Sequence, residues 1–242
     1  MTCSGMKLVA ASVLMLLLGC SQQPDSSTTE IKPDETGRII ESDETGSDDA
    51  VGSSASSAPP FDDLITVLAG ISRYSGARSI HLAAQSMGNF VLTEALKTID
   101  DRRPAGTEQT PLFDQVALAA PDINAREFVE RTGERILPFS RRFTVYASTQ
   151  DKALRLSKAV NGFEPLGFLN EYSRVGAKKR LFDLVDVSQL TTGWFESGHI
   201  YYGDMPEMIS DFSFLFRGIQ ARSLQRGLSE TPPVYRLARR GP

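Results

Sequence analysis

Cysteine and histidine are scarce in this 242-residue chain, and their scarcity excludes several kinds of chemistry. The only cysteines are Cys3 and Cys20, which both lie in or beside an apolar N-terminal stretch. The remainder of the chain therefore offers no thiol chemistry, no internal disulfide and no cysteine-based zinc site. Histidine occurs only at His81 and His199, so a metal site with several histidine ligands is not expected either. We expect the protein to work without a metal or any other cofactor.

The N-terminal apolar run, residues 8–18, is shorter than the roughly 20 apolar residues that a membrane-spanning helix needs. Lys7 precedes the run and small residues follow it, which is typical of a secretory leader. The tetrad LLGC at 17–20 resembles the bacterial lipobox, which implies cleavage before Cys20 and a lipid on that residue. A plain signal peptide or an N-terminal anchor is the alternative interpretation. Because Ser21 follows Cys20, the resemblance to bacterial lipoproteins favours a lipid-anchored protein of the cell envelope, on the periplasmic face of the outer membrane.

The composition then changes along the chain in a way that predicts separate segments. Residues 1–19 form the expected leader and residues 20–60 an acidic linker, in which positions 21–60 carry nine acidic and two basic side chains, a net charge of −7. Such a segment buries too little apolar surface to offset the entropy of ordering it, so we expect disorder. Residues 61–222 form the expected folded domain, and residues 223–242 a flexible basic tail. Domain and tail together carry only +2, which gives no support for a nucleic-acid partner.

Strand patterns alternate with helix patterns across the expected domain. Short apolar runs typical of buried strands occupy residues 79–84, 115–121, 141–148 and 181–187. Helix patterns occupy residues 61–71, 87–99, 125–132, 151–160 and 204–219. This alternation predicts the α/β class, with a mostly parallel sheet covered by helices on both faces.

The stretch AAQSMGNF, residues 83–90, lies where a predicted strand meets a predicted helix. Ser86 stands between Ala84 and Gly88, and small residues at these two places allow the sharp turn that presents a nucleophilic serine in hydrolases. The spacing alone is a weak signal, because a serine that ends a core strand is commonly structural. A nucleophilic serine also needs a base, and the base needs an acid that orients it.

Only two histidines can supply the base. His81 lies within the strand that leads to Ser86, away from the carboxyl end where ligands bind, so we interpret it as a packed core side chain. His199 lies in the polar loop ESGHIYYGD before the last predicted helix, where it could act as the base. The alternative is that His199 is a solvated loop residue.

Two aspartates can supply the acid. Asp151 follows the third predicted strand and Asp122 follows the second, so both lie at carboxyl ends of strands. Either residue gives the chain order serine, aspartate, histidine that the hydrolase fold uses. Asp122 could instead cap its helix or stabilise the loop, and Asp151 could likewise cap its own helix. We favour Asp151 and keep Asp122 as the alternative.

Four segments in the same order resemble a bacterial α/β-hydrolase family of unknown function in the esterase/lipase superfamily. They are IHLAAQSMGNFVLTEAL, VALAAPDINAREF, FTVYASTQDKALRLSKAVNG and GHIYYGD, and the resemblance spans roughly residues 62–215. It implies that Ser86, Asp151 and His199 form a catalytic triad. One departure is Gln85, where such proteins usually have histidine.

A larger departure from the family lies upstream of Ser79. Members of this fold place several strands before the nucleophile strand, and one of these ends in a loop that donates a backbone N–H to the oxyanion hole. Here a single helix pattern stands in that region, so the expected fold is a partial hydrolase fold truncated on its N-terminal side. The Met87 N–H is the donor that the sequence still offers, and loss of one donor costs roughly 10²–10³ in kcat.

The truncation has three competing explanations: an incomplete gene or lost segment, a partner chain or self-association that completes the sheet, and a degenerate hydrolase kept for binding. With four strands in sequence order, the nucleophile strand is expected at the sheet edge, where its backbone could pair with another chain. The function expected first is a serine hydrolase of esterase type that acts on an unknown small acyl substrate. The alternatives are a non-catalytic lipid-anchored envelope protein that uses the fold for binding and, third, a peptidase or acyltransferase with the same triad.

Overall fold

The structure is a computed structural model of the whole chain. It describes residues 14–19, 62–74, 76–107, 110–190, 202, 205–219, 226–230 and 234–238. Cys20, His199, and all of the predicted leader and linker except residues 14–19 lie outside the described residues.

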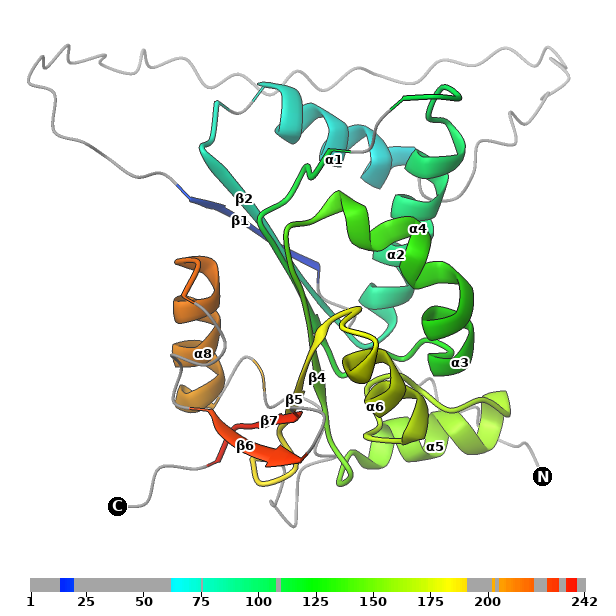
Figure 1. The fold of residues 1–242 in the computed structure, drawn as a ribbon, viewed down its shortest axis with the longest axis vertical. Coiled ribbons are helices and arrows are strands. Elements are labelled where there is room, and N and C mark those ends of the chain that lie inside the picture. The colour runs from blue at the N-terminus through cyan, green and yellow to red at the C-terminus, as the bar shows by residue number, and fades with distance from the viewer. Residues whose placement is uncertain are drawn as a thin grey trace, which may run out of the picture.

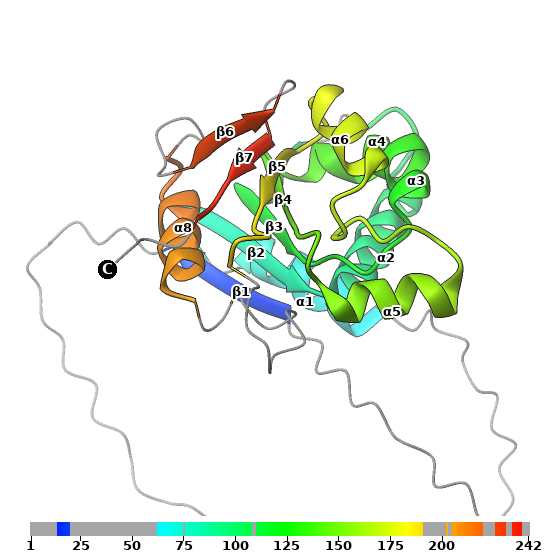
Figure 2. The same ribbon diagram turned by 90° about the horizontal axis from the view of Figure 1, so that it is seen from below.

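Within the described residues, one seven-stranded sheet forms the centre of the protein, in the order β1-β2-β3-β4-β5-β7-β6. The strands are β1 Leu14–Gly19, β2 Ser79–Gln85, β3 Gln115–Ala119, β4 Phe143–Ala147, β5 Asp183–Asp186, β6 Gly227–Glu230 and β7 Val234–Arg236. Strands β2, β3, β4, β5 and β7 run parallel, and the antiparallel strands β1 and β6 lie at the two edges (Figures 1 and 2). The predicted α/β class and the mostly parallel sheet are confirmed.

Helices cover both faces of this sheet. They are α1 Asp62–Tyr74, α2 Met87–Asp101, α3 Ala125–Glu127, α4 Gly133–Ile136, α5 Lys152–Asn161, α6 Glu171–Lys178 and α8 Pro206–Phe216, with a π-helical turn η1 Phe128–Thr132 and a 3₁₀ turn η2 Leu137–Phe139. Helices α1, α2, α4 and α6 pack on one face, and α8 packs on the other (Figure 1).

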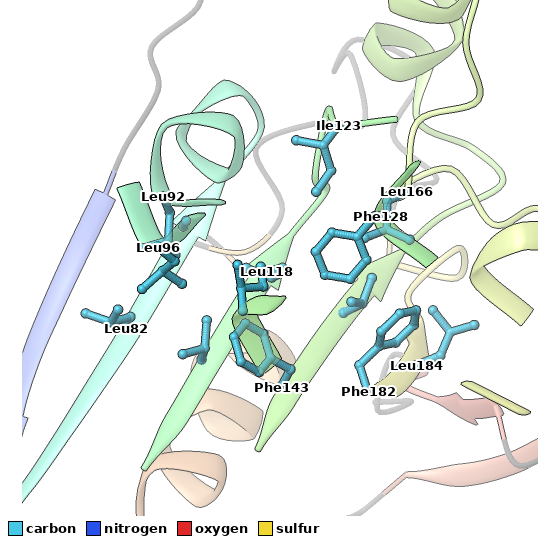
Figure 3. Packing of buried hydrophobic residues seen from close by; sticks show 14 of the residues in the cluster. Leu82, Leu92, Leu96, Leu118, Ile123, Phe128, Phe143, Leu166, Phe182 and Leu184 are labelled. Carbon is cyan, nitrogen blue, oxygen red and sulfur yellow. The ribbon is translucent and has the colours of Figure 1, made fainter. Parts of the chain in front are cut away.

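Alternating side chains of the strands supply the two halves of the core, as the two-residue period of a strand requires. Leu82 of β2 and Leu118 of β3 point towards α2, whereas their neighbours Ala83 and Ala117 join the cluster under α8. Figure 3 shows Leu82, Leu118 and Leu92 of α2 in the first cluster. Because the strands are buried on both faces, their sequences are continuous apolar runs, which is why the four central strands could be predicted.

The predicted flexible tail, residues 223–242, is corrected by the structure over part of its length. Residues 227–230 and 234–236 form β6 and β7, and β7 pairs in parallel with β5 through Val185 and Tyr235. Val234 and Tyr235 are buried. Pairing with β7 satisfies the backbone N–H and C=O groups of β5 on the side away from β4. The basic composition of the tail did not indicate this pairing.

The prediction that the nucleophile strand β2 forms an edge of the sheet is wrong for the 242-residue chain. β1 pairs with it antiparallel, from Leu14 opposite Ala84 to Gly19 opposite Ser79. The pairing has a simple physical reason. An unpaired strand exposes backbone N–H and C=O groups, and another extended segment can satisfy them. That segment comes from the predicted leader. Separately, no helix within the described ranges is long and apolar enough to cross a membrane.

A buried polar network fixes α8 and the C-terminal strands to β4. Arg226 Nε donates to Asp211 Oδ1 at 2.7 Å, and its Nη2 also binds the Asp211 carboxylate. The Tyr146 hydroxyl donates to Asp211 Oδ2 at 2.6 Å. Burial, followed by the Asp211 charge, raises the pKa of Tyr146 well above its ordinary value of 10.0, so its hydroxyl stays protonated as a donor. The network anchors α8, the helix that follows the segment containing His199.

Replacement of Arg226 by methionine is expected to destabilise the protein by about 3–5 kcal/mol, because it leaves the buried Asp211 carboxylate without its cation. The free energy of unfolding measured in urea checks this value. Arg141→Met is the control, since Arg141 pairs with Asp114 on the surface and should matter by about 1 kcal/mol or less. Equal losses in the two variants would contradict a buried, charge-paired network.

Candidate active site

Ser86 occupies a strained turn between β2 and α2. Its backbone has φ 50° and ψ −125°, a conformation that residues other than glycine rarely adopt. Its N–H donates to the carbonyl of Ala119 at 3.0 Å, which extends the β2–β3 ladder by one residue before the chain turns. The residue is 7% exposed. Strain of this kind costs about 1–3 kcal/mol and is characteristic of functional sites.

Asn89 holds this turn in place. Its side-chain Nδ2 donates to the Ser86 carbonyl at 3.0 Å and to the Ala119 carbonyl at 3.1 Å, and the residue is fully buried. One amide thus links the start of α2 to the end of β3. This role was not predicted from the sequence, although a polar residue three positions after Ser86 on the buried face of a helix was a usable signal.

The carboxyl ends of the parallel strands bring both candidate acids to the same edge as Ser86. Asp151 follows β4 and is fully buried, and its Oδ1 accepts the Leu154 N–H at 3.0 Å as the N-cap of α5. The cap that the sequence offered as an alternative role for Asp151 is therefore present. A carboxylate can accept several hydrogen bonds, so capping through Oδ1 is compatible with a second role.

Asp122, the alternative acid, follows β3, and its backbone approaches the Ser86 turn. Its N–H points at the Ser86 carbonyl, at 3.4 Å. Its carboxylate accepts the Ser157 hydroxyl of α5, at 2.7 Å from Oδ1 and 2.9 Å from Oδ2. It is Asn124 that caps α3, by accepting the Glu127 N–H, so the capping role considered for Asp122 is not the one it has.

Gly167 links the loops that carry the two aspartates through backbone hydrogen bonds. Its N–H donates to the Pro121 carbonyl at 2.8 Å, and its carbonyl accepts the Ser148 N–H at 2.9 Å. A Cβ at this position would lie 2.5 Å from backbone atoms of Ala120 and Pro121, so only glycine fits. Ala120 itself has φ 42°, a second strained residue at this edge of the sheet. No feature of the sequence distinguished Gly167 from other loop glycines.

Met87 opens α2, directly after Ser86. The first N–H groups of a helix have no acceptor within the helix, and they carry the positive end of the helix dipole. The Met87 N–H is therefore chemically suited to stabilise an oxyanion that forms on a group bound to Ser86.

Of the two histidines, His81 is among the described residues and His199 is not. His81 is buried within β2, where its ring lies 5.1 Å from that of Phe216, and burial lowers its pKa. This placement agrees with a packed core residue. His199 lies outside the described residues, in the chain between Leu190, just after β5, and Met205, just before α8. Within the described residues no cluster of three or more metal-ligating side chains occurs.

The strained turn predicts an unusual order of stability for two variants. Ser86→Gly is expected to be more stable than Ser86→Ala by about 1 kcal/mol, because relief of the positive φ outweighs the backbone entropy of glycine. Ser173 in α6 provides the matched control, where the glycine variant should be less stable than the alanine variant by about 1 kcal/mol. Chemical unfolding of the four variants checks the sign, and the same order at both sites would contradict a strained Ser86.

Comparison with known families agrees with this geometry. The sequence profile described as "Alpha/beta hydrolase of unknown function (DUF900)" matches residues 46–217. No curated protein and no solved structure matches the chain significantly. The matched range includes the strained serine, both candidate acids and His199. The chain therefore belongs to this family of alpha/beta hydrolases of unknown function.

Proposed function

We propose that the protein is a serine hydrolase that cleaves small acyl esters through Ser86, His199 and Asp151. The observation that carries this proposal is the backbone of Ser86, held at φ 50° on a strand-to-helix turn at the carboxyl edge of a parallel sheet. Such a turn presents a serine hydroxyl at the sheet edge in α/β-hydrolases. A structural serine would not need to keep this strain.

In the proposed reaction, the Ser86 hydroxyl oxygen attacks the ester carbonyl carbon while His199 accepts the hydroxyl proton. The carbonyl oxygen becomes an oxyanion, to which the Met87 N–H donates. The carbon–oxygen bond to the alcohol then breaks, and His199 returns the proton to the leaving alcohol. A water molecule attacks the acyl-enzyme by the same steps and releases the acid. Asp151 orients His199 and stabilises its positive charge.

The course of the chain supports His199 as the base. β5 is parallel to β2, so the segment that begins after Leu190 starts from the same sheet edge as Ser86. The segment ends at α8, which Asp211 ties to Tyr146 of β4, five residues before Asp151. Both ends of the His199 segment are thus anchored near the strands that carry the other two members of the triad.

We also propose that the mature protein is anchored to the outer membrane by a lipid on Cys20, facing the periplasm. The support is the LLGC tetrad and the apolar run before it. Cleavage before Cys20 would remove β1 and open the outer edge of β2. A strand from a partner chain or from a second copy would then complete the sheet, because an open edge of apolar residues pairs readily.

Hydrolysis of para-nitrophenyl butyrate by the 242-residue chain tests the proposed reaction. We expect a burst of nitrophenol followed by steady turnover, which reports an acyl-enzyme. Ser140→Ala is the matched control, since Ser140 is also 7% exposed but lies before β4, and it should retain the burst. Turnover that Ser86→Ala leaves unchanged would overturn the proposal.

A further inference from the structure

Helix α5 turns polar side chains towards the protein. Leu154 is its only buried residue. The Ser157 hydroxyl, on the same side of the helix, donates to the Asp122 carboxylate, and Asn161 one turn later donates to the Ser157 oxygen at 2.9 Å. A surface helix of a globular protein usually turns its apolar stripe to the core, so the arrangement of α5 is unusual.

The opposite side of α5 is apolar and exposed. Leu156 and Val160 are 58% and 75% exposed, and Ala159 is exposed as well. Residues three and four positions apart lie on one face of a helix, so these three side chains form one continuous stripe, which we call the α5 stripe. Single apolar side chains are normal on a protein surface, but an apolar stripe along one helix face indicates contact with something else.

Basic side chains flank the α5 stripe. Lys152 and Arg155 are exposed on the same half of the helix. Within the described part of the chain neither pairs with a carboxylate, whereas Lys158, on the other half, pairs with Glu164. The helix itself contains no acidic residue. The charges around the stripe therefore favour an anionic surface.

Helix α5 lies at the edge of the sheet that carries Ser86. It begins directly after Asp151, which follows the carboxyl end of β4, and its Ser157 binds Asp122, which follows β3. Figure 1 shows α5 at the end of the molecule towards which the parallel strands run. Met87, directly after Ser86, is a further large apolar side chain at this edge and is 43% exposed. A surface that touches the α5 stripe therefore lies at the same end of the molecule as Ser86.

The α5 stripe suits a lipid surface better than a second protein. A stable protein interface buries about 800 Å² on each partner and involves about 20–30 residues a side, far more than three side chains of one helix can supply. An amphipathic helix with basic flanks instead binds at the headgroup boundary of a bilayer, with its apolar side chains inserted. Such a contact is weak alone, but a lipid anchor on the same chain, as proposed at Cys20, would hold the helix near the bilayer.

We propose that α5 binds the surface of a bilayer that contains anionic lipids, with Leu156 and Val160 at the headgroup boundary and Lys152 and Arg155 against lipid phosphates. The end of the sheet that carries Ser86 then faces the bilayer, so the substrates are amphiphilic esters that the bilayer holds. The substrate class rests on the proposed hydrolase function. The membrane contact rests on α5, so the two can be tested separately.

The fluorescence of a single tryptophan tests the contact without any reaction. Trp194 is the only tryptophan, so Trp194→Phe provides the background for Leu156→Trp and for the control Val67→Trp. Val67 is 51% exposed but lies on α1, at the opposite end of the molecule from α5 (Figure 1). Phosphatidylglycerol and phosphatidylcholine vesicles with brominated acyl chains should quench the tryptophan at position 156 at least about twofold more than the one at position 67.

Both probe chains carry the same apolar N-terminal run, so membrane binding by that run cannot produce the difference. Unfolding transitions of the two chains check that the probes leave the fold intact. Equal quenching at the two positions, or none at position 156, would overturn the proposal. A dimer in sedimentation that Val160→Ser dissociates would assign the α5 stripe to a second copy and would also overturn it.

Replacement of the flanking bases tests the role of charge. Lys152→Gln combined with Arg155→Gln should reduce the quenching at position 156 several-fold, because each basic side chain near an anionic surface favours binding. Lys178→Gln combined with Lys179→Gln is the control, since these exposed lysines end α6 just before β5 begins, at the amino ends of the strands. Equal losses in the two double variants, or equal quenching by vesicles of phosphatidylcholine alone, would overturn an anionic partner.

Hydrolysis then tests the substrate class. We expect the ratio of kcat/KM for vesicle-borne para-nitrophenyl palmitate to that for soluble para-nitrophenyl butyrate to fall several-fold in the Lys152→Gln, Arg155→Gln chain but not in the lysine control. Quenching at position 156 without hydrolysis of either ester would support the membrane contact and overturn the hydrolase. Hydrolysis without that quenching would overturn the contact and leave the hydrolase standing. Hydrolysis with quenching but an unchanged ratio would overturn the substrate class alone.

Discussion

Replacing Ser86 by alanine is expected to lower kcat for ester hydrolysis by on the order of 10⁴–10⁶, because the reaction loses its nucleophile. The turn should survive the change, since alanine keeps the backbone strain and the Asn89 hydrogen bonds to the Ser86 carbonyl and Ala119 do not involve the Ser86 side chain. Initial rates at saturating ester, together with the unfolding transition of each variant, separate lost chemistry from lost folding.

The response of a second residue makes this prediction more specific. His199→Ala should cost a similar factor in kcat, and the Ser86→Ala, His199→Ala double variant should cost no more than either single variant, because members of one triad act as a unit. Additive losses would mean that the two residues act independently. In that case His199 is not the base that serves Ser86.

Asp151→Asn is expected to lower kcat by roughly 10³–10⁴, because an asparagine cannot stabilise a charged imidazole and favours the wrong tautomer. The asparagine side-chain oxygen can still accept the Leu154 N–H, so the N-cap of α5 and the fold should persist. KM should change little if Asp151 acts only through the histidine. The measurement is kcat and KM for one ester in both proteins.

Asp122→Asn is the matched control for the choice of acid. Asp122 follows β3, the strand next to the one that precedes Asp151, and its carboxylate accepts the Ser157 hydroxyl. Replacement of Asp122 should lower kcat by less than about tenfold. If Asp122→Asn caused the larger loss, Asp122 would be the acid and Asp151 a helix cap only. Comparable unfolding midpoints in the two variants are required for either conclusion.

The central strands and the position of the serine could be predicted because their signals are local. Strands buried on both faces are continuous apolar runs, as in IHLAA before Ser86. The serine lies between small residues where such a run meets a helix pattern, and the structure places it on a strained turn there. The cap that Asp151 provides for α5 was also foreseen, as an alternative to its catalytic role.

What could not be predicted depends on contacts between distant parts of the chain. Strands β6 and β7 are short, and their burial follows from pairing with β5 rather than from their own composition. The role of Gly167 depends on the approach of Pro121, 46 positions earlier in the chain. A pocket of about 200 Å³ is likewise formed by α2, the loop after β3 and Phe163, which lie far apart in the sequence.

A covalent probe gives the decisive test of Ser86 as the nucleophile: the intact mass of the 242-residue protein after treatment with a fluorophosphonate, with Ser86→Ala and Ser140→Ala as parallel samples. We predict one adduct per chain in the unaltered protein and in Ser140→Ala, located at Ser86 by peptide mapping, and none in Ser86→Ala. A folded, monodisperse sample that forms no adduct, or forms it equally in Ser86→Ala, would contradict a catalytic Ser86. Such a result would favour a binding protein built on the hydrolase fold.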